Sequence, residues 1–140
     1  MDHIVLRNEI QTDPLAIGYS ALVAAGNDAG VATMLNTPIA GQWIFDGRMA
    51  SNVLFELIDA AEYAALNADQ KNVLFGVLGM GEVDLTGANA LAIMQSLFAN
   101  PSNTRTNIIN RVRRNPTRAE MLFGIKSHVT DLDVALALRG

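Results

Sequence analysis

The stretch from residue 49 to residue 81, MASNVLFELIDAAEYAALNADQKNVLFGVLGMG, constrains the fold more than any other part of the chain. In its first half, apolar residues recur at helical spacing and polar residues fill the opposite side. Asn67, with Gln70 three residues later, is typical of a helix start, and a second apolar run follows it. The pattern predicts two amphipathic helices in a hairpin, whose apolar face must be covered by other segments.

The composition favours helices for the remaining segments too. The chain has 140 residues, 50% of them hydrophobic, which suits a single domain with one core. Its apolar residues are mainly Ala and Leu, not the β-branched and aromatic residues of sheets. We therefore predict an all-α fold, a single compact domain of about six to eight short helices around the central hairpin.

The predicted domain has three parts. Residues 1–48 form an N-terminal cover and loop, residues 49–81 the central hairpin, and residues 85–140 a set of C-terminal helices that is basic at 105–118. Capping patterns predict helix starts in the first and third parts. They lie at Asp13-Pro14, at Asn27 or Asp28, at Thr117 with Glu120, and at Thr130 with Asp133.

Residues 36–48 form the most loop-like stretch, and they contain Trp43 and Phe45. Large apolar residues in a connector either fill a gap in the core or project towards a partner. We favour core packing, because the lone tryptophan of a small domain is usually largely buried.

Charged residues are sparse and unevenly distributed. They make up 17% of the chain, which indicates that other chains cover part of its apolar surface. Residues 105–140 contain seven Lys or Arg and three Asp or Glu, which gives a net charge of +4. Residues 1–104 contain three Lys or Arg and eleven Asp or Glu, which gives a net charge of −8. Opposite charges suit head-to-tail packing of copies or docking onto a charged neighbour. The alternative is that they only solvate two faces.

No catalytic, cofactor or metal-binding motif is present, so we predict no enzyme, no cofactor and no metal. His3 and His128 have no ligand partner at helical spacing, and cysteine is absent. Glu56, Asp59 and Glu62 recur every three residues, which predicts three carboxylates on one helix face. They would hold a cation, act as an acid and base, or, as we favour, solvate the helix.

Five arginines near the C-terminus form the one concentration of positive charge. They are Arg105, Arg111, Arg113, Arg114 and Arg118. Nucleic-acid binding needs several such residues on one face, usually of a basic domain. Because this chain is acidic overall, we favour salt bridges between subunits for them. No apolar run reaches the length of a membrane helix, so we expect no membrane partner.

Three blocks of sequence together resemble a known group of proteins. They are NEIQTDPLAIGYSAL with VATMLNT, at residues 8–22 and 31–37, VLFELIDAAEYAALNADQKNVLFGVLGMGEVDLTG, at 53–87, and TRAEMLFGIKSHVTDLDVALALRG, at 117–140. Their order is similar to that in small structural-module proteins encoded among the structural genes of tailed bacteriophages and prophages. The resemblance covers most of the chain.

This resemblance implies a virion component, made in the bacterial host cytoplasm, that contacts other virion proteins and copies of itself. It implies a neck, tail or baseplate adaptor, or a capsid cement subunit. The alternative is a nucleic-acid-binding phage accessory protein that uses the arginines of 105–118. The candidate partner contacts are Trp43, Phe45, Arg105, Arg111, Arg113, Arg114 and Arg118.

Overall fold

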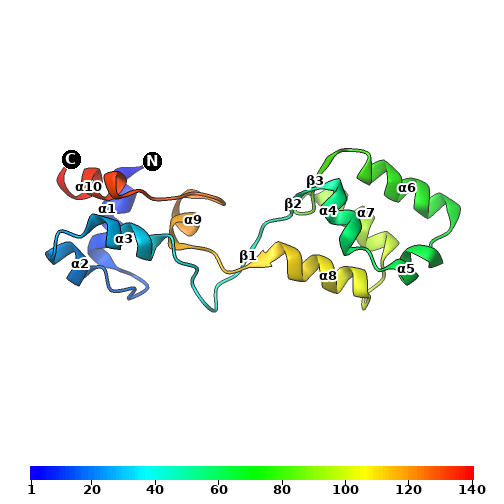
Figure 1. Ribbon diagram of the computed structural model, residues 1–140, viewed down its shortest axis with the longest axis horizontal. Coiled ribbons are helices and arrows are strands. Elements are labelled where there is room, and N and C mark those ends of the chain that lie inside the picture. Colours follow the sequence, from blue (N-terminus) through cyan, green and yellow to red (C-terminus); the bar gives the residue numbers. More distant parts are fainter. The chain divides into compact units, whose positions relative to one another are not determined.

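The computed structural model describes residues 1–140, and it is mostly helical, with ten helices and four short strands (Figure 1). The helices are α1 (His3–Thr12), α2 (Ser20–Ala24), α3 (Asp28–Leu35), α4 (Ser51–Leu57), α5 (Ala60–Ala65), α6 (Ala68–Leu78), α7 (Ala88–Leu97), α8 (Asn103–Val112), α9 (Arg118–Phe123) and α10 (Asp131–Arg139). The strands are β1 (Ile44–Phe45), β2 (Arg48–Ala50), β3 (Glu82–Asp84) and β4 (Arg113–Arg114). The prediction of a helical protein is confirmed at this level, but the short strands and the higher number of helices were not predicted.

The chain divides into two compact units, each with its own core. The terminal unit consists of residues 1–42 and 115–140, and the inserted unit consists of residues 43–114. This differs from the expected single domain, in which residues 1–48 cover the central hairpin. The hairpin region is covered from within the inserted unit, by β3, α7 and α8, so residues 1–42 pack with the C-terminal helices instead.

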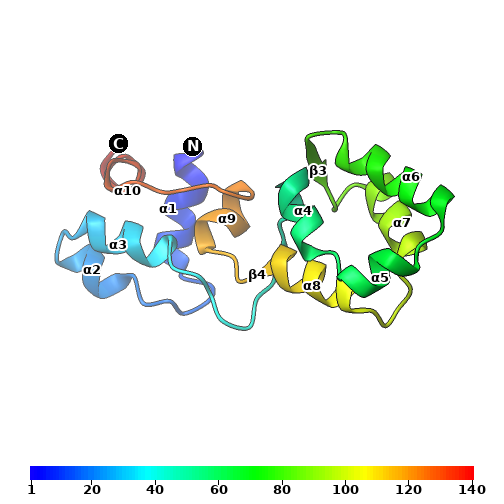
Figure 2. The same cartoon turned by 45° about the vertical axis from the view of Figure 1, so that its right-hand side comes forward.

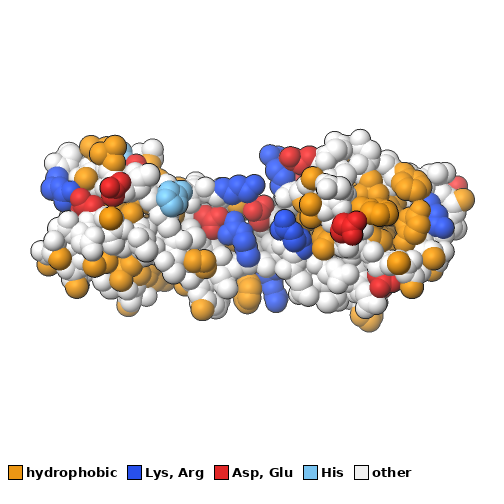
Figure 3. Space-filling view, in the orientation of Figure 1, with side chains coloured by type: hydrophobic (Ala, Val, Ile, Leu, Met, Phe, Trp, Pro, Cys, Tyr) orange, Lys and Arg blue, Asp and Glu red, His pale blue; other side chains and the backbone are white.

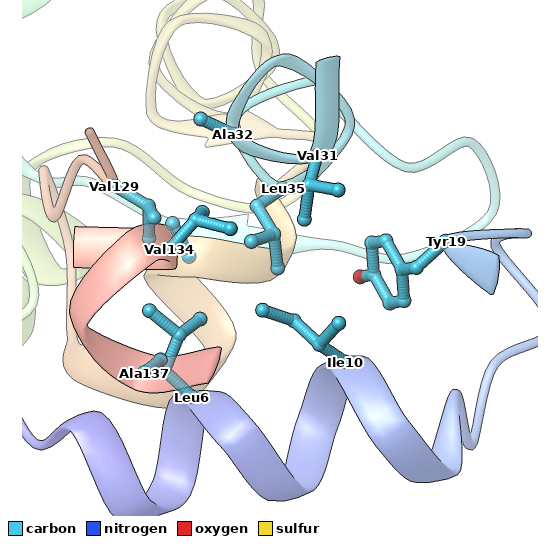
Figure 4. Packing of buried hydrophobic residues seen from close by; sticks show 10 residues of the cluster. Leu6, Ile10, Tyr19, Val31, Ala32, Leu35, Val129, Val134 and Ala137 are labelled. Atoms are coloured by element: carbon cyan, nitrogen blue, oxygen red, sulfur yellow. The ribbon is translucent and has the colours of Figure 1, made fainter. Parts of the chain in front are cut away.

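The core of the terminal unit lies between α1, α3, α9 and α10. Figure 4 shows buried side chains of α1, α3 and α10 converging with those of Tyr19 and Val129, with the Tyr19 ring beside Ile10. The largest of them are Leu6, Tyr19, Val31, Leu35, Val129 and Val134. Capping boxes at Thr117 with Glu120 and at Thr130 with Asp133 start α9 and α10, as predicted. The start of α3 after the N-cap Asn27 is also confirmed.

The predicted helix start at Asp13-Pro14 is wrong. Asp13 ends α1 instead, in a left-handed conformation with φ of 41°. Its carboxylate then accepts hydrogen bonds from the backbone N–H groups of Ile17 and Gly18, both at 2.7 Å. Asp side chains stabilise turns in the same way as they cap helices, so the residue type alone does not separate the two roles.

The inserted unit packs its five helices, α4 to α8, around a second core (Figure 2). Two antiparallel strand pairs, β1 with β4 and β2 with β3, accompany them. The buried side chains come from every part of the unit, and include Met49, Leu54, Leu74, Val83, Met94 and Phe98. The capping box of Asn67 and Gln70 starts α6, as predicted.

The predicted first helix of the hairpin is broken into α4 and α5. The break lies at Ile58 and Asp59, which both have extended backbone conformations. Asp59 is the N-cap of α5, and its backbone N–H donates to the hydroxyl oxygen of Thr104 at 3.0 Å. Because this partner is 45 residues away, the break is not visible in the local apolar pattern. After α6, Gly81 has a left-handed φ of 78°, whereas the C-cap residue Gly79 keeps a right-handed conformation.

The fold redistributes the charge asymmetry of the sequence. The terminal unit contains seven acidic and four basic residues, which gives a net charge of −3. The inserted unit contains seven acidic and six basic residues, which gives a net charge of −1. Because the terminal unit contains both ends of the chain, the basic C-terminal third is shared between the units. None of the helices has both the length and the apolar character that crossing a bilayer requires.

Candidate functional site

The β1–β4 ladder of the inserted unit exposes two aromatic side chains beside an arginine. Phe45 is paired with Arg113, and Ile44 with Arg114. The Arg113 guanidinium lies over the Trp43 ring, 4.4 Å from its centroid, which is a cation–π contact. Trp43 is 52% exposed and Phe45 54% exposed, so the expectation of core packing for these two aromatics is wrong. Side chains alternate along a strand, and here Ile44 takes the less exposed position between them.

An apolar groove of about 390 Å³ lies between α7 and α8 of the same unit. Its walls are formed by apolar side chains, with Phe45 among them. The lining residues are Phe45, Gly47, Leu85, Thr86, Leu91, Met94, Gln95, Phe98, Arg105, Ile108, Ile109 and Val112. Arg105 is the only charged residue of this lining, so the groove carries a single positive charge and no negative charge.

The groove follows from the apolar stripes of its two helices. On α8 the lining residues Arg105, Ile108, Ile109 and Val112 recur at helical spacing. The lining residues of α7 and its C-cap do the same from Leu91 to Phe98. In the sequence, Ile108, Ile109 and Val112 have the spacing of a stripe on one side of a helix. Ile109 is nevertheless 46% exposed and Leu91 41% exposed, because no segment of the unit covers the outer part of either stripe. Figure 3 shows hydrophobic side chains gathered on the visible face of this unit.

Arg105 is held rigidly at the wall of the groove. Its Nε donates to the backbone oxygen of Phe98 at 2.5 Å, and its Nη2 donates to that of Gln95 at 2.9 Å. Both acceptors belong to the C-terminal turn of α7, where a positive charge is favourable. The guanidinium therefore has helix carbonyls as partners, and no carboxylate is among its hydrogen-bond partners.

The other predicted arginines do not form one patch. Arg114 pairs with Asp46 at 3.5 Å, and Arg118 belongs to the terminal unit, where it pairs with the buried Glu9. Arg111 is exposed and makes no side-chain hydrogen bond or ion pair. Of the seven predicted contact residues, the structure thus places Phe45 and Arg105 in the groove. Trp43, directly before β1, lies against Arg113 of the adjoining ladder.

Comparison with protein-family models, with curated proteins and with solved structures finds no match for this chain.

The prediction of three carboxylates on one helix face is wrong, because the helix breaks between Glu56 on α4 and Asp59, the N-cap of α5, which carries Glu62. Glu62 accepts hydrogen bonds from the backbone N–H groups of Asn103 at 2.6 Å and Thr104 at 2.9 Å, at the start of α8. Hydrogen bonding from Thr104 holds the pKa of the Glu62 carboxyl below its usual value. Hydrogen bonding from the backbone of Glu62 does the same for the pKa of Asp59. Two carboxylates that stay ionised and cap helices are suited to structure and not to proton transfer at neutral pH.

The histidines also have structural surroundings. The Nε2 of His3 lies 3.2 Å from the Asp133 carboxylate. His128 is exposed beside a shallow depression of the terminal unit, in which Asn36 is already hydrogen-bonded twice to the backbone of Val129. No group of three His, Cys, Asp or Glu side chains in the chain is arranged to hold a metal ion. The groove is therefore the feature with the clearest capacity to bind something.

Sequence reasoning missed the groove itself, although it identified some of its residues. The sequence of α8 did contain an indication of the groove. The adjacent residues Ile108 and Ile109 widen its apolar stripe, so that one neighbouring helix cannot cover the whole stripe. Whether the outer part of such a stripe is covered depends on where α7 lies, which no local pattern specifies.

Proposed function

We propose that this chain is a non-enzymatic structural component of a tailed-phage virion that acts by protein–protein contacts. Its place would be in the tail or baseplate, in the neck, or on the capsid as cement. The observation that carries the proposal is the uncovered apolar groove between α7 and α8, with Phe45 in its wall. Contiguous apolar surface that water alone covers is typical of a docking site.

The residue types around the groove support a protein partner. Trp43 and Arg113 stack on each other on the exposed ladder that also carries Phe45. Tryptophan and arginine are the residues most enriched among those that dominate binding energy, and they act in the centre of an apolar patch. Arg105 is already oriented by two hydrogen bonds, so little entropy is lost when a partner contacts it.

The virion part of the proposal is supported by the sequence blocks at residues 8–22 with 31–37, at 53–87 and at 117–140. Their resemblance is to proteins encoded among phage structural genes. The low charge content of 17% supports a role in which neighbouring chains cover apolar surface.

The nucleic-acid alternative has less support from the side-chain contacts. Phosphate binding needs several free cations on one face. Arg114 and Arg118 are already paired with carboxylates, those of Asp46 and Glu9. Arg113 lies over Trp43, and the inserted unit has a net charge of −1. A DNA gel shift that weakens steeply with salt would favour this alternative over protein docking.

The proposal is tested on purified particles of the source phage. We expect mass spectrometry to find the wild-type chain in stoichiometric amount and to find it lost when Ile109→Asp replaces it. Asp places an uncompensated charge in the groove, and Ile109 is exposed enough for the fold to tolerate it. Val73→Asp, at an exposed position of α6 outside the groove lining, is the matched control that should be retained.

Absence of the wild-type chain from particles would refute the virion role. Equal retention of both variants would refute the role of the groove. A copy number close to that of the major capsid protein indicates a cement or repeating tail subunit, and a much lower one indicates a neck or baseplate protein.

A further inference from the structure

We infer that the groove binds the outward face of α10 from a second copy of this chain, so that copies associate head to tail. The inference rests on the proposed function and names the partner of the same groove. It is carried by three observations: the two-sided apolar character of α10, the spacing of its exposed leucines, and the charge in the groove.

Helix α10 is apolar on two opposite sides. Val134 and Ala137 are fully buried against the rest of the terminal unit, where α10 packs on α1 and α3. Leu132 is 64% exposed and Leu136 44% exposed. At about 100° per residue, both leucines lie about 160° from Val134, on the far side of the helix. Apolar residues on both sides of a helix indicate that both sides are buried in the functional state of the protein.

The spacing of these leucines fits a groove between helices. Helices that dock in apolar grooves use anchors at positions i, i+3, i+4 and i+7. Among the exposed large hydrophobic residues of the whole chain, Leu132 and Leu136 are the only two on one helix at i and i+4. The exposed Ile4 of α1 has no such companion. The groove presents the complementary surface, because Leu91, Ile109 and Phe45 line it and are partly exposed.

The charges are complementary as well. Arg105 is the one charged residue of the groove, and helix carbonyls are its hydrogen-bond partners. Asp131 directly precedes Leu132, is exposed, and makes its side-chain hydrogen bond only to the neighbouring Leu132 N–H. An α10 helix bound in the groove would therefore bring the Asp131 carboxylate towards the Arg105 guanidinium, which has no carboxylate partner within its own chain. The terminal unit also has a net charge of −3, which favours its approach to the arginine.

Such a contact joins two different surfaces, so it is heterologous. Each bound copy leaves one free groove and one free α10, and association continues until a ring closes or a filament grows. A single helix in a groove buries less than the roughly 800 Å² per partner of a standard interface, so we expect weak pairwise affinity. Closure of a ring strengthens weak contacts because every copy is then held twice.

Sedimentation velocity of the full chain tests the inference, at concentrations from about 10 μM to about 1 mM. We expect self-association of the wild type, and a loss of about tenfold or more in affinity for Leu136→Asp on α10 and for Ile109→Asp in the groove. The matched controls are Ile4→Asp in the terminal unit and Val73→Asp in the inserted unit. Both are exposed apolar positions outside the proposed contact, and both should associate as the wild type does.

The decisive step mixes the two defective variants. Leu136→Asp keeps an intact groove and Ile109→Asp keeps an intact α10, so the mixture should form a dimer that cannot grow further. Far-UV circular dichroism of each variant checks that it is folded. No complex in the mixture, a monomeric wild type at every concentration, or loss of association in Ile4→Asp but not in Leu136→Asp would each overturn the inference.

The same variants separate the two proposals. If the wild type is monomeric but Ile109→Asp is lost from particles, the groove binds another virion protein and only the present inference fails. If particles lack the wild-type chain, the virion function fails whether or not copies associate in solution.

Discussion

At the scale of single residues, the fold gives Arg118 a role that the sequence does not predict. In the sequence it belongs to the basic stretch, but in the fold its Nε and Nη2 donate to the two carboxylate oxygens of Glu9, at 2.8 and 2.6 Å. The side chains of Arg118 and Glu9 are only 13% and 2% exposed. The hydroxyl of Tyr19 also donates to Glu9, at 3.3 Å, and burial together with the charge of Glu9 raises the pKa of Tyr19. These three residues form a polar network inside the terminal unit.

We predict that Arg118→Ala lowers the free energy of unfolding by about 3 kcal/mol, because it leaves the buried Glu9 carboxylate without its countercharge. Urea denaturation followed by circular dichroism measures the change. Arg111→Ala, which removes an exposed arginine without an ion pair, should change stability by no more than about 0.5 kcal/mol. The double variant Glu9→Gln with Arg118→Met should recover much of the loss, since no unpaired charge remains. Equal effects of the two arginine variants would contradict the structural role of Arg118.

At the scale of elements, α8 shows how side chains from other elements fix where helices start and end. Its N-cap Ser102 accepts a hydrogen bond from the Arg105 N–H at 3.2 Å, and Glu62 of α5 accepts two more at the same end. Arg105 of α8 in turn caps the C-terminal turn of α7. Free N–H and C=O groups at helix ends need such partners. The walls of the groove are therefore held at their ends by polar contacts, while the apolar side chains between them stay available.

We predict that the inserted unit loses stability in acid through Glu62. Its folded pKa is lowered below the usual 4.5, so its contribution is fully present above pH 4.5 and is lost as pH falls through the folded pKa. Urea denaturation of the inserted unit at neutral pH and at about pH 3 measures this loss. Glu62→Gln should be less stable than the wild type at neutral pH and should show a smaller further loss in acid.

Glu56→Gln is the control for this prediction, because it removes a nearby carboxylate that makes no hydrogen bond. An acid response unchanged by Glu62→Gln, or reduced equally by Glu56→Gln, would count against the cap at the start of α8.

At the scale of the whole molecule, one compact unit is inserted into another. The chain passes between them twice, after Gln42 and after Arg114, and each unit ties these two passages together by itself. In the inserted unit they form the β1–β4 ladder. In the terminal unit the Asn115 Nδ2 donates to the Gln42 oxygen at 2.7 Å, and the Ile39 N–H donates to the Pro116 oxygen at 2.9 Å. The two ends of each unit are thus side by side.

We predict that each unit folds without the other, because each buries its own hydrophobic cluster. A fragment of residues 43–114, and a terminal unit in which Gln42 is joined to Asn115 by a short Gly-Ser linker, should both show helical circular dichroism and cooperative thermal unfolding. Both units should tolerate the cut, since the two ends of each unit are already hydrogen-bonded to each other. A fragment that is disordered alone and folds only with its counterpart would show that the cores depend on each other.

The features that could be predicted from the sequence are those whose hydrogen bonds close within a few residues. The boxes at Asn67 with Gln70, at Thr117 with Glu120 and at Thr130 with Asp133 span three residues each, so the helix starts and the helical class follow from local pattern. The exposed aromatics of the ladder were recognised as candidates, but their burial was misjudged because it depends on the pairing of β1 with β4.

Only the tertiary structure decided the division into two units, the break before α5 and the separate roles of the arginines. These depend on partners far apart in the chain, such as Asp59 with Thr104, 45 residues apart, and Arg118 with Glu9, 109 residues apart. Apolar periodicity predicts which side of a helix is buried, but it does not predict which segment of the chain covers that side. The groove between α7 and α8 exists for that reason. The apolar stripes of both helices can be recognised in the sequence, but the packing of the helices determines that the outer residues of each stripe stay exposed.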